Sequence, residues 1–312
     1  MANGSRHSMR YVAEATYGTT PATPAFKPIR HTGTTLGLSK ESLQSEELRD
    51  DRQIADFRHG AYQVGGDINI ELSYGSFDDL LEAVLLGTWA VDGGGAGIDR
   101  LKAGVTRRSF TVERFFGDIL SADKPYHRFT GVEFNTLSLA INANAMITGS
   151  FGVLGQGMST GTAIIAGATY AAATTTSPLD SFTGTLSEAG TPIAVITEIS
   201  LSLENSLEAR FVVGSKQSIR PSIGRSNVTG QVTAYFENSA LLDKFINETE
   251  SSIEFELPDG AGNKYTFTLP RIKYTGGQPD VDGEGPITLS MPFQALLDAT
   301  TGTNLIIDRQ DA

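Results

Sequence analysis

The segment Ser76–Gly87, "SFDDLLEAVLLG", has the pattern of a short amphipathic helix, and a similar segment, Asn238–Thr249, "NSALLDKFINET", occurs far downstream. Ser76 with Asp79 in the first, and Asn238 in the second, are typical of helix N-termini. The apolar residues repeat at the 3.6-residue period of a helix, at Leu80, Leu81, Val84 and Leu85 in the first segment and at Leu241, Leu242, Phe245 and Ile246 in the second. The pattern predicts two short helices, each with its apolar stripe buried against a sheet.

The similarity continues outward from the helices. Ser42–Gly66 aligns to Ser206–Gly230 without a gap, so the offset between the two segments is constant. Alternating apolar residues precede each aligned segment, in "TTLGLSK" and "ISLSLEN", and come after it, in "DINIEL" and "QVTAYF". This alternation is typical of strands with one buried face. We therefore interpret the chain as two tandem copies of one unit.

The predicted fold class is mainly β, with two tandem β-sandwich or half-barrel domains that each carry one short flanking α-helix. The first domain covers residues 25–155 and the second covers residues 183–298. Residues 1–24 are expected to form an N-terminal arm, and residues 299–312 a C-terminal tail. Residues 156–182 are rich in Thr, Ala and Gly without a sustained period, as expected of a linker.

Composition argues against several classes of function. The 312-residue chain has no cysteine and a net charge of −12, which disfavours a grip on nucleic-acid phosphates. It has four histidines, none of them in an i, i+4 pair, and no G-x-S-x-G motif. No apolar run is long enough to cross a bilayer. We expect a soluble protein that is not an enzyme and has no catalytic, cofactor-binding or metal-binding residues.

The long loop of the first copy, Arg49–Gln63, "RDDRQIADFRHGAYQ", is the best candidate for a binding segment. It alternates opposite charges with apolar residues and is long for a hairpin. One interpretation is a solvated loop. The other is a docking arm whose apolar residues are buried at an interface. The candidate docking residues are Arg49, Arg52, Ile54, Phe57, Arg58 and Tyr62.

The N-terminal stretch Tyr11–Gly33, "YVAEATYGTTPATPAFKPIRHTG", and the closing stretch Gly285–Leu296, "GPITLSMPFQAL", together with the loop and helix, resemble the tail tube proteins of long-tailed bacteriophages. The resemblance implies a structural virion protein of the phage tail, assembled in the bacterial host cytoplasm. It implies stacked rings around a channel for DNA delivery, an inner β-barrel of strands from neighbouring subunits, and a long loop that contacts the adjacent ring. It also implies three partners, which are the tape-measure, tail tip and tail terminator proteins.

Most members of that family have one tube domain and form hexameric rings. Two domains in one chain predict instead a homotrimer with pseudo-hexameric rings. The alternatives are another structural virion component, such as a tail adaptor or decoration protein, and a carbohydrate-binding β-sandwich. For the tube we expect an acidic channel through which double-stranded DNA passes without specific binding, with Glu71 and Glu237 as candidate wall acids. The other possibility is that the acids lie outside and serve only solubility.

Overall fold

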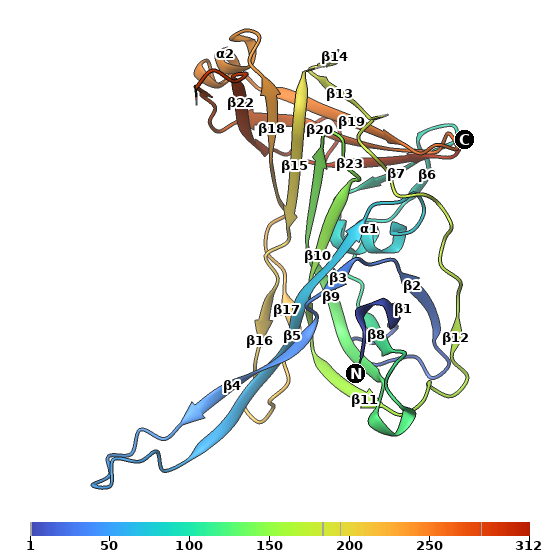
Figure 1. Cartoon of the computed structure of the whole chain (residues 1–312), viewed down its shortest axis with the longest axis vertical. Helices are drawn as coiled ribbons and strands as arrows, with labels where there is room; N and C mark the ends of the chain where they lie inside the picture. Colours follow the sequence, from blue (N-terminus) through green and yellow to red (C-terminus); the bar gives the residue numbers. More distant parts are fainter. Residues whose placement is uncertain (1, 183, 194, 282) are drawn as a thin grey trace.

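The computed structural model describes residues 2–182, 184–193, 195–281 and 283–312, and the fold is mainly β with two short α-helices (Figure 1). The predicted strand-rich class is confirmed. Residues 2–182, the first half, form the 3-10 turns η1 (Gly4–Arg6) and η2 (Ser121–Asp123), the helix α1 (Asp78–Leu85), and the strands β1 (His7–Ala13), β2 (Ala25–Ile29), β3 (Gly33–Thr34), β4 (Gly37–Gln44), β5 (Phe57–Glu71), β6 (Ala90–Gly95), β7 (Ile98–Lys102), β8 (Phe110–Phe116), β9 (Tyr126–Asn142), β10 (Thr148–Gly155), β11 (Gly157–Gly161) and β12 (Thr169–Tyr170).

Residues 184–312, the second half, contain the other helix and the remaining strands. They are β13 (Thr185–Glu188), β14 (Thr191–Pro192), β15 (Ile196–Glu204), β16 (Glu208–Arg210), β17 (Ile219–Ser222), β18 (Asn227–Tyr235), α2 (Ala240–Ile246), β19 (Ser251–Pro258), β20 (Lys264–Tyr274), β21 (Pro279–Asp280), β22 (Thr288–Ala295) and β23 (Ile306–Gln310).

One antiparallel sheet runs through both halves, and we call it the shared sheet (Figure 1). Its strand order is β4, β5, β10, β9, β15, β18 and β22, with β3 beside β5 at one end and β20 and β21 beside β22 at the other. The halves meet in its centre, where Leu139 of β9 lies opposite Leu201 of β15. Side chains alternate between the two faces, so Ile68, Leu139 and Leu201 are buried in one continuous core.

The strand pairing of the first half recurs in the second half. The order β4, β5, β10, β9, β8 corresponds to the order β15, β18, β22, β20, β19. The register recurs as well, since Leu38 lies opposite Val64 as Leu203 lies opposite Val228. The two strand pairs predicted to correspond, β4 with β15 and β5 with β18, thus have equivalent hydrogen-bonded neighbours.

Irregularities in the ladders also recur. The β8–β9 pair shifts register between Phe110 and Val112, and the β19–β20 pair shifts register between Ser251 and Ile253, near the start of the corresponding strand. A register shift costs ladder hydrogen bonds and bends a strand. Its occurrence at matching positions shows that the two halves share their strand geometry as well as their strand order.

Helix α1 is buried, as predicted from its apolar stripe. Its predicted N-cap is wrong. The helix begins at Asp78 with Phe77 at the N-cap position and no side-chain capping bond. The Ser76 hydroxyl is instead engaged with Ser73 and Thr174, so it is not available to the helix. Two acids in the first turn, Asp78 and Asp79, stabilise the helix, because their negative charges interact favourably with the positive N-terminal end of the helix dipole.

Helix α2 differs from its counterpart. The predicted N-cap, Asn238, is wrong, because Ser239 holds the N-cap position. The Asn238 side chain still accepts a hydrogen bond from the Ala240 N–H at 2.9 Å. The predicted burial of its stripe is wrong for the single chain. No α2 residue is buried, Leu242 and Phe245 are half-buried, and Ile246 is 64% exposed. The cause is that the single chain places too little structure over this helix.

The segments expected to lie outside the domains contribute strands. Residues 1–24 include β1, which pairs with β2 and β8. Residues 156–182 include β11, which extends the β9 ladder, and β12, which pairs with β2. Residues 299–312 include β23, which pairs with β7 of the first half and β20 of the second. Of these pairings, those of β23 join the two halves, whereas those of β1, β11 and β12 lie within the first half.

Candidate functional site: the polar face of the shared sheet

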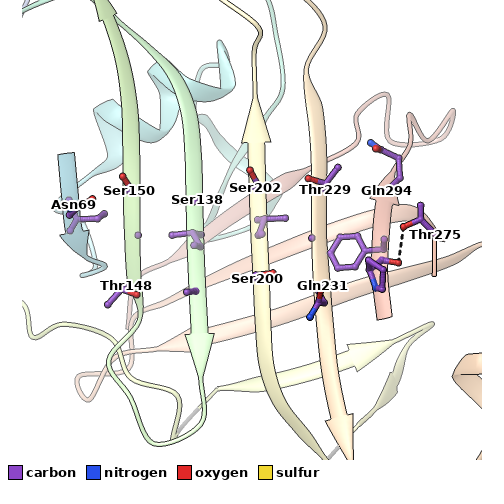
Figure 2. Close-up of a pocket in the computed structure, with 18 of the residues that line it drawn as sticks. Asn69, Ser138, Thr148, Ser150, Ser200, Ser202, Thr229, Gln231, Thr275 and Gln294 are labelled. Carbon is purple, nitrogen blue, oxygen red and sulfur yellow. Dashed lines mark hydrogen bonds between the residues drawn. The ribbon is translucent and has the colours of Figure 1, made fainter. Parts of the chain in front are cut away.

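The face of the shared sheet opposite the core is covered by small uncharged polar side chains (Figure 2). Cross-strand pairing places one row of them from β5 to β22, which consists of Asn69, Ser150, Ser138, Ser202, Thr229 and Gln294. A second row from β10 to β22 consists of Thr148, Ala140, Ser200, Gln231 and Pro292. Both rows line a shallow concavity of about 730 Å³ that spans the two halves.

This surface results directly from the sequence alternation. In "LSLAIN" and "ISLSLE" apolar residues that enter the core alternate with Ser, Ala, Asn or Glu, whose side chains point to the other face. Because the side chains of the two rows are short and uncharged, the rows present hydroxyl and amide groups without a fixed charge. Neither of the two rows contains an ionisable side chain of the kind that general acid–base catalysis uses.

Charged residues flank the two rows. Glu71 lies opposite Thr148 at the β5 end of the second row. Asp67 and Glu204 occupy the next row on one side, and Glu198 the next row on the other. Lys273 lies opposite Gln294 at the β20 end. Acids therefore outnumber bases on this face, but they lie at its margins.

The two candidate channel acids lie in different places in the structure. It brings Glu71 to the polar face, whereas Glu237 lies exposed beyond the end of β18. Sequence reasoning missed Asp67, Glu198 and Glu204. The period-two alternation could have found them, because each is an even number of residues from an uncharged member of the same face.

Strands β4 and β5 extend as a hairpin far from the body of the molecule, and residues 45–56 form its tip (Figure 1). Within this arm Arg49 pairs with Asp51 at 2.8 Å, and Arg58 pairs with Asp56 at 2.7 Å. Exposed ion pairs of this kind contribute about 0–1 kcal/mol each. Two bases of the predicted docking loop thus already have partners inside the arm.

The apolar residues of the arm are not covered by the rest of the chain. Ile54 is exposed, and Phe57, the first residue of β5, is 49% exposed. Arg52 is also exposed, on a turn with positive φ. Tyr62 lies closer to the body, where its N–H donates to the Lys216 carbonyl at 2.9 Å. The structure therefore places five of the candidate docking residues on a projecting arm and the sixth at its base.

The corresponding segment of the second half forms the shorter hairpin β16–β17 beside the base of β5 (Figure 1). The Lys216 ammonium donates to the His59 carbonyl at 2.7 Å, and Tyr62 and Gln217 form a parallel bridge. Its loop also exposes apolar side chains, among them Val212 and Val213. The two arms leave the sheet on the same side of the molecule.

Three of the four histidines lie close together, which sequence reasoning did not predict. His7 is in β1, His127 is in β9, and His31 follows β2, the strand that pairs with β1. The Arg114 Nε–H donates to His7 Nε2 at 3.1 Å, so His7 Nδ1 donates to His31 Nε2 at 2.8 Å. Burial and the nearby Arg114 charge lower the pKa of His7 to about 4, and burial also lowers the pKa of His31 and His127. The group is neutral and structural, and the described residues contain no cluster suited to a metal ion.

The sequence profile of the phage tail tube protein family matches residues 4–295. The chain belongs to this family. It is a structural, non-enzymatic component of the virion tail, as tail tube proteins are, and such proteins self-assemble. The predicted family, the structural role in the phage tail and the location in the virion tail are confirmed. No curated protein matches this tail tube protein by sequence. Neither of its described helices has the length and hydropathy needed to cross a bilayer.

Proposed function

We propose that the chain builds the tail tube as trimeric rings in which each chain supplies two tube units. The units are residues 25–155 and 183–298. Three chains then provide the six positions of a pseudo-hexameric ring. The shared sheets of the three chains join into one barrel, and the polar face of that barrel lines the channel.

The recurrence of strand order and register in the two halves is the observation that carries this proposal. Both halves use the same pairing scheme, and β9 joins β15 edge to edge so that the second half continues the sheet of the first. A sheet that grows by repeating one unit can close into a barrel, which removes exposed strand edges.

The polar face suits a channel that DNA crosses without sticking. The two central rows contain no Lys or Arg, so they offer nothing to bind phosphates by counterion release. The flanking acids Asp67, Glu71, Glu198 and Glu204 repel the phosphate backbone. Glu237 lies beyond β18 and is not part of the wall in this proposal. The wall is thus neutral in the centre, and its margins carry these four acids together with Lys273 at the β20 end.

In the same proposal the β4–β5 arm docks one ring onto the next. Ile54 and Phe57 become buried in the adjacent ring and supply most of the energy, since burial of large apolar side chains dominates interfaces. Arg49, Arg52, Arg58 and Tyr62 set the orientation. The tape-measure protein fills the channel during assembly, and the tail tip and terminator proteins close the two ends.

Native mass spectrometry of rings and a cryo-EM reconstruction of tubes test this function together. We expect three chains per ring, near-sixfold density, and Ser138 and Ser202 at the inner wall. Six chains per ring would show that the two halves do not occupy equivalent positions. A lumen lined by Lys and Arg, with the sheet face turned outward, would contradict the assigned channel.

A further inference from the structure

The two ends of the shared sheet are strands with one unpaired edge. In the part of the chain that the structure describes, β3 and β4 pair with β5 alone, and β21 pairs with β22 alone. Unpaired edges are the sites at which another chain adds a strand. The partner can be identified because the chain contains its own example of such a junction.

That example is the pairing of β9 with β15 in the centre of the sheet. The residue pairs Leu38–Val64 and Leu203–Val228 show that the β3–β4 edge is the first-half counterpart of β15. The counterpart of β9 in the second half is divided between two strands. β20 corresponds to its first part, and the residue pairs Leu139–Gly149 and Pro279–Leu289 show that β21 corresponds to its last part, which pairs with β15 inside the chain. The two free edges are therefore equivalent to the two strands already joined inside the chain.

We propose that β21 of one chain pairs antiparallel with the β3–β4 edge of a second copy, in the register of the internal junction. Leu139 lies opposite Leu201 and Ser138 opposite Ser202 inside the chain. The transferred register places Pro279 opposite Leu36 and Gln278 opposite Gly37. This assignment rests on the proposed ring and specifies the contact between its chains.

Hydrogen bonding at the edge fits this register. The Thr35 N–H donates to the Asp67 carbonyl of β5, so the neighbouring Leu36 directs its N–H and C=O away from β5. Proline has no N–H and cannot donate to the carbonyl opposite. The Leu36 carbonyl does not need that donor, because it already accepts a hydrogen bond from Arg114 at 2.6 Å. In the single chain the Leu36 N–H donates to the Thr34 hydroxyl at 3.1 Å, and in the proposed junction the Pro279 carbonyl replaces that hydroxyl as its acceptor.

The exposure of side chains near β21 agrees with a missing neighbour. Ile141 of β9 is 9% exposed beside β15, whereas its counterpart Val281 is 68% exposed. Helix α1 is covered partly by the second half, whose Asn205 amide donates to the Val84 carbonyl at 2.7 Å. Helix α2 lacks such a cover. A second copy that pairs with β21 would cover both Val281 and helix α2.

Disulfide trapping tests the register directly, because the chain has no cysteine of its own. Gly37→Cys with Gln278→Cys places two thiols opposite each other in the proposed junction, and a Cβ at Gly37 meets only an ordinary contact with the Thr35 carbonyl at 3.6 Å. We expect mild oxidation of assembled rings to give covalent trimers on a non-reducing gel. Ser138→Cys with Ser202→Cys is the matched control, and should lose its thiols while remaining a single chain.

A shifted pair makes the test specific. Gly37→Cys with Gly276→Cys moves one thiol two residues along the strand, about 7 Å, beyond disulfide reach, so it should remain monomeric on the gel. A second in-register pair, Thr34→Cys with Val281→Cys, repeats the test if the first variant does not assemble. Intact rings that cross-link through the shifted pair, or through neither in-register pair, would overturn the register. Absence of rings from the unmodified protein would instead contradict the proposed function.

Discussion

Helices α1 and α2 occupy the same place in the two halves, yet one is buried and the other is not. Leu80, Leu81 and Val84 of α1 have no exposed surface, whereas α2 has no buried residue. The difference lies in the segments that come after each helix along the chain. The second half packs over α1 through Asn205 and through β20 and β23, but no later unit covers α2. In a chain of repeats, the last repeat is left with the surface that the next molecule covers.

Truncation of matched leucines gives the largest expected effect. Leu81→Ala should lower the free energy of unfolding of the isolated subunit by about 2–5 kcal/mol, because it leaves a cavity in a packed core. Leu242→Ala should cost clearly less, since its side chain is only half-buried. Urea denaturation of both variants measures the difference. Equal losses in the isolated subunit would show that α2 is packed as tightly as α1.

Removal of the Asn205 amide tests how the second half holds α1. Asn205→Ala leaves the buried Val84 carbonyl without its partner, which should cost about 1–3 kcal/mol. Asn304→Ala is the control, because the Asn304 amide makes only a long, exposed hydrogen bond to Ser226 at 3.4 Å. Thermal and urea unfolding should separate the two variants. If the Asn205→Ala protein were as stable as the control, the Asn205–Val84 hydrogen bond would not contribute to the stability of α1.

The histidine cluster makes the first half sensitive to acid, and the second half has no counterpart among the four histidines of the chain. The unfolded chain binds a proton at His7 near pH 6.5, but the folded protein does so only near pH 4. The stability that the neutral His7 contributes is therefore fully present above about pH 6.5 and is lost as the pH falls toward 4. Protonation of His7 would also place its charge beside Arg114, with His31, His127 and Phe116 around it.

His7→Gln should flatten the loss of stability between about pH 7 and about pH 5, measured as the change in urea midpoint. His59→Gln is the matched control, because His59 is exposed on the β4–β5 arm. An unchanged pH dependence in the His7 variant would assign the acid sensitivity to other groups.

Changes in the two arms should have the smallest effect on the subunit. Ile54→Ser in the β4–β5 arm and Val213→Ser in the β16–β17 hairpin replace exposed side chains, so each should alter the free energy of unfolding by less than about 0.5 kcal/mol. Tube length in negative-stain images then distinguishes the arms. We expect Ile54→Ser to leave rings and shorten or abolish tubes. Normal tubes from Ile54→Ser, with loss of tubes from Val213→Ser, would transfer the docking role to the shorter hairpin.

The repeated strands could be predicted because period-two alternation is a local signal. Ile68 and Ile70, like Val232 and Ala234, enter the core as the alternation indicates. The burial of α1 was likewise predictable from its stripe. The same signal failed at α2, because an apolar stripe shows which face of a helix needs cover and does not show whether the same chain supplies that cover.

Features that depend on distant segments were not accessible from local pattern. His7, His31 and His127 meet only because β1 pairs with both β2 and β8, and β8 pairs with β9. Strand β23 links the halves through residues that are 208 positions apart, as the ion pair between Arg100 of β7 and Asp308 of β23 illustrates. Ser76 does not cap helix α1, because its hydroxyl is hydrogen-bonded to Thr174, which lies far along the chain. In each case tertiary contacts decided between local options of similar energy.

The junction of β9 with β15 has a consequence for how a tube could be initiated. In a ring of three chains, half of the unit-to-unit junctions form as each chain folds, and their strands meet at an effective concentration that dilution cannot change. Only the other half depends on how many subunits are present. When the protein is still scarce in the cell, closing a ring would then require only three subunits to meet, because each subunit already contains one β9–β15 junction.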